Sequence, residues 1–297
     1  MSNKQKAILL MLLSTLSFSV MQLIVKLSSG DIPTMEQVFA RNFVTLIFGF
    51  VMARRVKAPL CGHSGSRLLL LGRAVCGYIG VAGYFYATTN MNVADASLLH
   101  RSSPFFVMLF SAMFLKNRLG WKQITALLLA FGGAVLVIDP SFRSDLLPAA
   151  AGLASAAGAG AAYVIINALR GRENNATIIF AFSAVSCLLS VVFGFGSFIM
   201  PSGSDWLMLA GIGVFAGAGQ VLLTSAYKMT EPGEVSIINY TGILFSALFG
   251  TVFLNETLGV RSICGMALIF SAALVVYFAK ESRNKPANNN TVSGGEK

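Results

Sequence analysis

The chain has 297 residues, of which 55% are hydrophobic and only 11% are charged, and its mean hydropathy is +0.72. This composition excludes an ordinary soluble domain and is typical of an integral membrane protein. The net charge of +10 does not indicate a nucleic-acid partner, because such a partner requires a soluble basic surface and the sequence offers none.

Ten apolar segments follow one another along the chain, separated by short polar breaks such as Asp139-Pro140-Ser141. An α-helix needs roughly 18 to 25 apolar residues to cross a bilayer, and these segments show no strand-like alternation. The sequence therefore predicts an all-α membrane protein with ten transmembrane helices. The predicted spans are 6–27, 34–53, 67–88, 94–115, 122–139, 148–168, 176–200, 205–228, 233–254 and 260–279.

The chain also repeats itself, since residues 87–138 match residues 226–277 without a gap, 139 positions later. Ser97/Ser236, Phe106/Phe245 and Gly120/Gly259 are among the identical pairs. Each copy holds five predicted spans, an odd number, so the second copy must enter the bilayer upside down. Inverted repeats of this kind are typical of secondary transporters, in which the substrate site lies between the halves.

The duplication divides the chain into a first repeat at 1–139 and a second repeat at 140–280. Residues 281–297 contain too few apolar groups to form a core, and we expect a disordered cytoplasmic tail there. With the N-terminus inside, cytoplasmic segments hold sixteen Lys and Arg residues, whereas external loops hold only Arg143 and Arg261. This positive-inside bias predicts a multi-pass protein of the cell inner membrane with both termini in the cytoplasm.

Cations inside the apolar segments are the first candidates for a substrate site, because a charge in hydrocarbon is costly unless it faces a cavity or a partner. These cations are Lys26, Arg41, Arg73 and Arg101. Each of these cations has a structural explanation as well as a functional one. Lys26 and Arg73 lie close enough to helix ends to reach the headgroups.

Arg41 and Arg101 lie about two turns from the outer ends of their spans. A structural ion pair with Glu36, Asp95 or Asp31 would explain them without a ligand. The functional interpretation is a cationic floor that receives an anionic group of the substrate.

One face of the third span combines Arg73, Gly77, Gly80 and Tyr84 at helical spacing, and such a face belongs toward a cavity or another helix. In the fourth span, His100 points about 100° away from Arg101, so His100 is expected to face a neighbouring helix if Arg101 faces the cavity.

The duplication places polar groups at equivalent depths, since His100 corresponds to Asn239 and Arg101 to Tyr240. Each remaining polar residue could equally serve helix packing. The complete set of candidate substrate-binding residues is Gln22, Arg41, Arg73, Tyr84, His100, Arg101, Tyr163, Asn167, Gln220, Asn239 and Tyr240.

Small residues in 149–162 and the Gly213/Gly217 pair predict close helix packing, and Pro104 predicts a kink in the fourth span. The four cysteines lack paired spacing, and no nucleotide-binding glycine-rich loop is present. We therefore expect no cofactor, no metal and no ATP-driven transport. A membrane enzyme would need clustered catalytic groups, and the chain has only His63 and His100 as histidines.

Several motifs resemble those of the drug/metabolite transporter superfamily, specifically its ten-helix members built from two EamA domains. The resemblance covers roughly residues 7–279. It rests on the duplication and on Phe253-Leu-Asn-Glu256-Thr-Leu-Gly259, Gly265, Glu231-Pro-Gly-Glu234, Arg41 and Pro104. The first repeat departs from the pattern, because Asn117 stands where the family usually has an acidic residue.

The resemblance implies a secondary active transporter, an exporter or exchanger that works by alternating access, and not an enzyme. Its partners would be the lipid bilayer and a small organic metabolite, with a coupling proton or counter-substrate left open. The excess of buried cations favours an anionic or zwitterionic substrate, such as an organic acid or an amino acid. Neutral or cationic metabolites or drugs remain the alternative, with the arginines neutralised by acidic neighbours, and a membrane enzyme is the remote one.

Overall fold

The computed structural model describes residues 2–28, 32–91, 93–116, 120–138, 146–194, 196, 198–254 and 259–278. These residues form helices and connecting segments without a strand, which confirms the all-α membrane class. The predictions for the tail at 281–297, the turn at 139–141, Asn117 and Glu256 lie outside this part of the chain.

Most predicted spans are single helices whose ends differ from the prediction by a few residues. The helix of the seventh predicted span, 176–200, ends at Gly194, and residues 198–200 are irregular. The helices are α1 (Asn3–Leu27), α2 (Thr34–Arg55), α3 (Arg67–Asn90), α4 (Val93–Arg101), α5 (Ser103–Phe114), α6 (Trp121–Ile138), α7 (Leu146–Ala168), α8 (Asn175–Gly194), α9 (Gly203–Met229), α10 (Pro232–Ile238), α11 (Thr241–Leu254) and α12 (Val260–Phe278), with a 3₁₀ turn, η1, at Ser64–Ser66.

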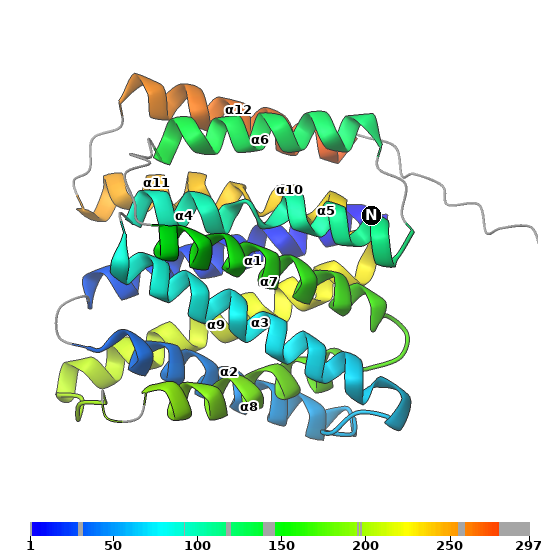
Figure 1. Ribbon diagram of the computed structural model, residues 1–297, viewed down its shortest axis with the longest axis vertical. Helices are drawn as coiled ribbons and strands as arrows, with labels where there is room; N and C mark the ends of the chain where they lie inside the picture. Colours follow the sequence, from blue (N-terminus) through cyan, green and yellow to red (C-terminus); the bar gives the residue numbers. More distant parts are fainter. Residues whose placement is uncertain are drawn as a thin grey trace, which may run out of the picture.

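Two predicted spans are each broken into two helices. The fourth consists of α4 and α5, and the ninth consists of α10 and α11. Among the described helices, nine stretches are individually long and apolar enough to cross a membrane, with α10 and α11 forming one of them. Helices α4 and α5 are too short individually, at 9 and 12 residues. They lie end to end in Figure 1 and together make the tenth span.

The two breaks occupy equivalent places in the repeats and share a local cause. The hydroxyl of Ser102 donates to the carbonyl of Leu99, and the hydroxyl of Thr241 donates to the carbonyl of Ile238, 139 positions later in both cases. Backbone bonds at both breaks run from residue i to i−3, which tightens the turn and ends the α-helix. In the first repeat Pro104 also lacks the N–H that would continue the ladder.

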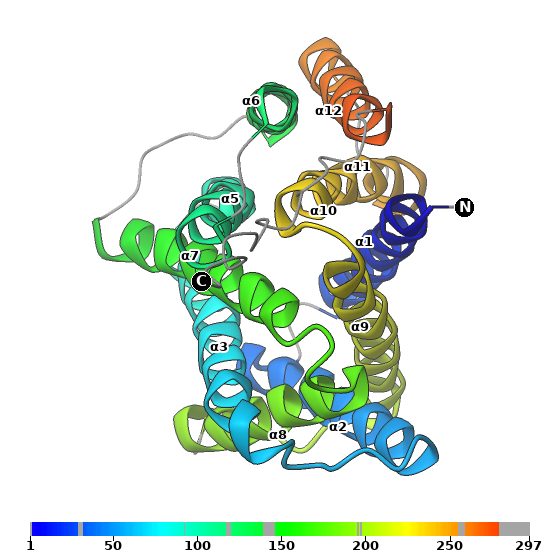
Figure 2. The same ribbon diagram turned by 90° about the vertical axis from the view of Figure 1, so that its right-hand side faces the viewer.

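Helix pairing follows a pseudo-two-fold pattern. Helix α2 packs on α8 and α6 packs on α12, so each contacts its own counterpart, while α1 packs on α9 and α3 packs on α7. The last two pairs are equivalent, because α1 and α7 open the two repeats and α3 and α9 are the third helices. Figure 2 shows this arrangement end-on, with α6 and α12 together at one side.

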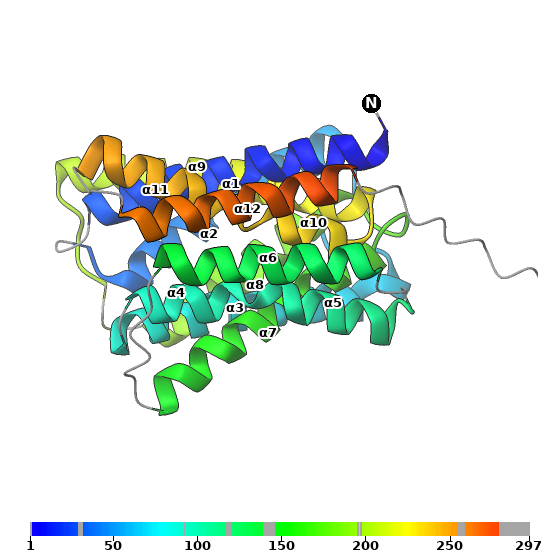
Figure 3. The same ribbon diagram turned by 90° about the horizontal axis from the view of Figure 1, so that it is seen from above.

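The repeats run in opposite directions through the bundle. In Figures 1 and 3, α1 starts at the end of the bundle where α7 finishes. The start of α1 and the finish of α12 lie together at that same end, where Gln5 Nε2 donates to the Tyr277 hydroxyl at 3.4 Å. We call this the α1-start end. Large apolar side chains such as Leu68 and Phe193 are exposed on the periphery, as a lipid-facing surface requires.

Small residues bring several helices into backbone contact, as their sequence pattern predicted. A Cβ on Gly158 of α7 would lie 2.8 Å from the carbonyl oxygen of Cys76 in α3. In the α6–α12 pair, a Cβ on Gly133 would lie 2.6 Å from the carbonyl oxygen of Gly265. No side chain fits at either position without moving the helices apart.

Gly133→Ala is therefore expected to destabilise the protein by about 1–3 kcal/mol, as overpacking does. Gly132 is the matched control, because a Cβ there meets no atom within 4 Å. Both substitutions gain the same helix propensity, so their difference reports the contact. The midpoint of thermal unfolding in detergent measures it, and equal midpoints for the two variants would contradict the packing described here.

Candidate functional site

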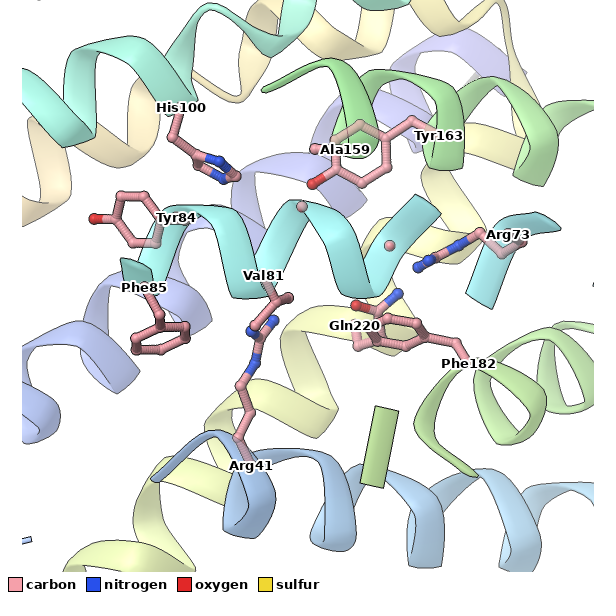
Figure 4. A pocket seen from close by; sticks show the side chains of 12 residues that line it. Arg41, Arg73, Val81, Tyr84, Phe85, His100, Ala159, Tyr163, Phe182 and Gln220 are labelled. Atoms are coloured by element: carbon pink, nitrogen blue, oxygen red, sulfur yellow. The ribbon is translucent and has the colours of Figure 1, made fainter. Parts of the chain in front are cut away.

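A cavity of about 90 Å³ lies between helices of both repeats, at mid-depth in the bundle. It has room for several water molecules. The residues on α3 that line it run from Arg73 to Phe85, the middle of a helix that extends from Arg67 to Asn90. The lining residues, shown in Figure 4, are Arg41, Arg73, Gly77, Gly80, Val81, Tyr84, Phe85, His100, Ala159, Tyr163, Phe182 and Gln220.

The predicted face of α3 forms one wall of this cavity, because Arg73, Gly77, Gly80 and Tyr84 all line it. Gly77 lies where a side chain would collide with the Arg73 guanidinium and with the ring of Phe182. The missing side chain thus lets the arginine lie along its own helix. Gly80 lies beside the backbone of α7, where a Cβ would be 3.1 Å from the Ala159 nitrogen.

Arg73 is enclosed and incompletely satisfied. It is 2% exposed, and its guanidinium lies 4.3 Å from the centre of the Phe182 ring, in a cation–π contact. Its Nε and Nη1 atoms are buried without a hydrogen-bond partner. The snorkelling explanation requires contact with the surface, which this burial does not provide. An unpaired buried donor is costly, so the arrangement favours a ligand that accepts from these groups.

Arg41 reaches the same cavity from α2, and its guanidinium lies 5.8 Å from the centre of the Phe18 ring. Its expected partner Glu36 is engaged elsewhere, because Glu36 Oε2 accepts from the backbone nitrogen of Ile199 at 3.1 Å. The structural ion pair with Glu36 is therefore wrong for this structure. Asp31 and the side chains of Asp95 and Lys26 lie outside the described residues.

We expected Arg101 to face the cavity and His100 to face a neighbouring helix, but the structure shows the reverse. His100 lines the cavity, with Nδ1 2.9 Å from the hydroxyl of Ser155 and its ring 4.6 Å from that of Tyr84. Arg101 is absent from the described lining and lies beside Gly242, near the second helix break. The rotation of 100° between neighbours separates the two side chains, but α4 presents the histidine to this cavity.

The second repeat supplies Tyr163 and Gln220. The ring of Tyr163 stacks on that of Tyr227 with centroids 4.6 Å apart. Gln220 Nε2 donates to the Thr224 hydroxyl at 3.2 Å, which orients the amide at the cavity wall.

The other sequence candidates lie outside the described lining. Asn167 donates to the carbonyls of Tyr227 and Thr230 at 2.7 and 2.9 Å, and so caps the end of α9. Gln22 is exposed and accepts from Ser246 at 3.3 Å. Tyr240 is 1% exposed within the apolar core. Six of the eleven candidates are therefore brought together, and Gln22, Arg101, Asn167, Asn239 and Tyr240 are not.

Sequence reasoning missed Phe182, the ring beneath Arg73. No pattern distinguished it among 23 phenylalanines. A ridge of α8 that packs on α3 brings it into the cavity, which is a tertiary contact without a local signal.

Polar contacts join several helices at the α1-start end. Lys4 Nζ of α1 lies 3.4 Å from Glu234 Oε1 of α10, with both side chains 5% exposed. The Thr230 hydroxyl donates to Glu234 Oε2 at 3.2 Å. Burial, and then the neighbouring Glu234 carboxylate, raise the pKa of Glu231. This cluster joins α1, α9 and α10 at the α1-start end.

Comparisons with known proteins agree with the duplicated membrane fold. The model of the EamA-like transporter family matches residues 5–139 and again 146–278. The pseudopaline exporter CntI of Pseudomonas aeruginosa is 34% identical over 279 residues, covering 93% of this chain and 98% of the relative. Human solute carrier family 35 member G1 is 27% identical, covering 82% of this chain and 71% of the relative.

A crystal structure of a protein with 19% sequence identity superposes with a TM-score of 0.80, covering 92% of this chain and 96% of the other. At that identity the likeness establishes the fold alone.

The buried ion pair gives a stability prediction. Glu234→Gln leaves Lys4 buried opposite a neutral group, and we expect a loss of about 3–5 kcal/mol, as for removal of one partner of a buried pair. The double variant Lys4→Met/Glu234→Met removes both charges and should recover most of that loss.

Lys6→Met is the control, because Lys6 is exposed two residues further along α1. Thermal unfolding of the four proteins forms the measurement. A double variant that is no more stable than Glu234→Gln would show that the two charges do not interact.

Proposed function

The chain belongs to the EamA-like transporter family and is a multi-pass membrane transporter, and we propose that it carries a small anionic or zwitterionic organic metabolite by alternating access. The observation that carries the proposal is the pair of guanidinium groups, Arg41 and Arg73, in a cavity whose described lining contains no Asp or Glu. Guanidinium groups stay charged in proteins, so such a cavity attracts an anion.

The architecture supports transport between the repeats. Residues of both repeats line the cavity, and each repeat has a broken helix whose ends carry polar residues. Transporters built from inverted repeats commonly bind substrate near discontinuous helices at mid-membrane. Rocking of one half against the other would open the cavity to each side in turn.

The direction of transport and its energy source are inferred from a relative and from the sequence. One relative is named as an exporter, which favours an exporter or exchanger. The sequence has no nucleotide-binding loop, so an ion or counter-substrate gradient would drive movement. The positive-inside bias supports insertion in the cytoplasmic membrane with the α1-start end in the cytoplasm.

Neutral or cationic substrates are favoured less by this geometry. They require acidic neighbours that neutralise the arginines, whereas Glu36 bonds to the backbone of Ile199. An ammonium group in the cavity would also be repelled by two fixed positive charges.

The proposal predicts which compounds bind. A thermal-shift screen of the purified protein should find stabilisation by organic acids or amino acids and none by polyamines, because a ligand of the folded state raises the unfolding temperature. The stabilising compound is then followed as radiolabelled flux into proteoliposomes. Stabilisation and flux with polyamines alone would refute an anion-selective site.

Arg41→Ala and Arg73→Ala are each expected to raise the half-saturating concentration for that compound about 10- to 100-fold, the effect of losing one charged hydrogen bond. Arg55→Ala is the control, since Arg55 ends α2 and is exposed. Monodispersity in detergent and helical content verify folding. Unchanged flux in both cavity variants would remove the arginines from the site.

A further inference from the structure

The charges in the cavity indicate a narrower class of substrate. This inference rests on the proposed function. Two guanidinium groups enter the cavity from different helices, Arg41 from α2 and Arg73 from α3. Figure 4 shows both turned toward the space between these helices and α7, with the amide of Gln220 between them and Tyr163 on the α7 side. Both line the same cavity of about 90 Å³ and carry the same charge. One monovalent anion can therefore satisfy one guanidinium but leaves the second charge uncompensated.

Each guanidinium is held separately by an aromatic ring. Arg73 lies 4.3 Å from the Phe182 ring and Arg41 lies 5.8 Å from the Phe18 ring, on different helices. Contact with a ring face leaves the N–H edges available for hydrogen bonds in the plane of the guanidinium. At Arg73 two of those nitrogens, Nε and Nη1, are buried without a partner. Each guanidinium therefore has its own aromatic support, on a different helix, and can bind an anionic group of its own.

Tyr163 and Gln220, which line the same cavity as the two arginines, are neutral. Tyr163 offers a hydroxyl and Gln220 an amide, and neither can compensate a charge. A substrate ammonium group would find no carboxylate among the described lining residues. The same residues can hydrogen-bond to an uncharged hydroxyl or to a short carbon chain bearing one.

We infer that the transported molecule carries two anionic groups, one bound by Arg41 and the other by Arg73, as in a small dicarboxylate. Tyr163 and Gln220 then contact the segment that joins the two groups. An amino acid with one carboxylate would match this site less well than a dicarboxylate of similar length, because its ammonium adds a third positive charge.

Matched ligands test the inference on the purified protein. The probes are linear dicarboxylates from malonate to adipate, each with its monoamide and its diamide, measured by thermal shift and by calorimetry at constant ionic strength. Each series keeps shape and length while the charge falls from two to one to none. At least one dicarboxylate should bind about 10- to 100-fold more tightly than its monoamide, and the diamide should bind most weakly.

Two variants assign the anionic groups to residues. Arg41→Gln and Arg73→Gln should each reduce the preference for the dicarboxylate over its monoamide to less than about threefold, because only one guanidinium remains. Unliganded Arg73→Gln should unfold at the same temperature as the wild type or higher, since it loses an unpaired buried charge. This result separates a changed site from a misfolded protein. Arg55→Gln, the control, should keep the full preference.

The possible failures are distinguishable. If monoamides or amino acids bind as tightly as the dicarboxylates, the dianion inference is wrong while an anion carrier stands. If no dicarboxylate binds but a monovalent organic acid does, the dianion inference is likewise wrong and the anion carrier stands. If only diamides or polyamines bind, the dianion inference and the proposed anion carrier fail together.

Discussion

The cost of burying a guanidinium without a carboxylate is the constraint on which the structure depends. Two such groups, Arg41 and Arg73, enter one small cavity within the membrane-spanning part of the bundle. Hydrocarbon cannot solvate them, and no carboxylate among the described lining residues neutralises them. Aromatic rings lie against both guanidinium groups, and a bound anion would supply the neutralising charge. Two buried nitrogens of Arg73, Nε and Nη1, have no hydrogen-bond partner in the described structure, and an anionic group could accept from them.

The duplicated fold explains how the constraint is met. Inverted repeats place α2, α3 and α4 opposite α7, α8 and α9, so both halves share one cavity. Equivalent hydroxyls, Ser102 and Thr241, end the fourth helix of each half near the middle of the membrane. Small residues let α3 and α7 touch through their backbones, which leaves smooth surfaces between the halves. At the α1-start end, the Lys4–Glu234 pair joins α1 of the first half to α10 of the second, so it holds the halves together on that side.

Much of this architecture could be predicted from the sequence because it depends on local periodicity. Hydropathy located the helices, and the 139-residue offset revealed the duplication. Pro104 predicted a kink in the fourth span, where the structure has a helix break. The equivalent break at Asn239–Tyr240 has no proline and arises from turn hydrogen bonding that no sequence pattern specified. The helical spacing of Arg73, Gly77, Gly80 and Tyr84 correctly identified a cavity wall.

The remaining features depend on how helices rotate and pack against one another. The choice between His100 and Arg101 depends on the rotation of α4 about its axis, which the sequence leaves free. Asn167 looked like a site residue because a buried amide is conspicuous, yet its partners are the carbonyls at the end of α9. Phe182 was missed because its contact with Arg73 joins residues more than 100 positions apart.

A high-resolution structure of the carrier with its transported molecule bound tests the central claim most directly. We expect ligand density in the cavity, with anionic groups within hydrogen-bonding distance of Arg41 and of Arg73, between the ring of Tyr163 and the amide of Gln220. Density at another place in the bundle, or a bound molecule that leaves both guanidinium groups without contact, would contradict it.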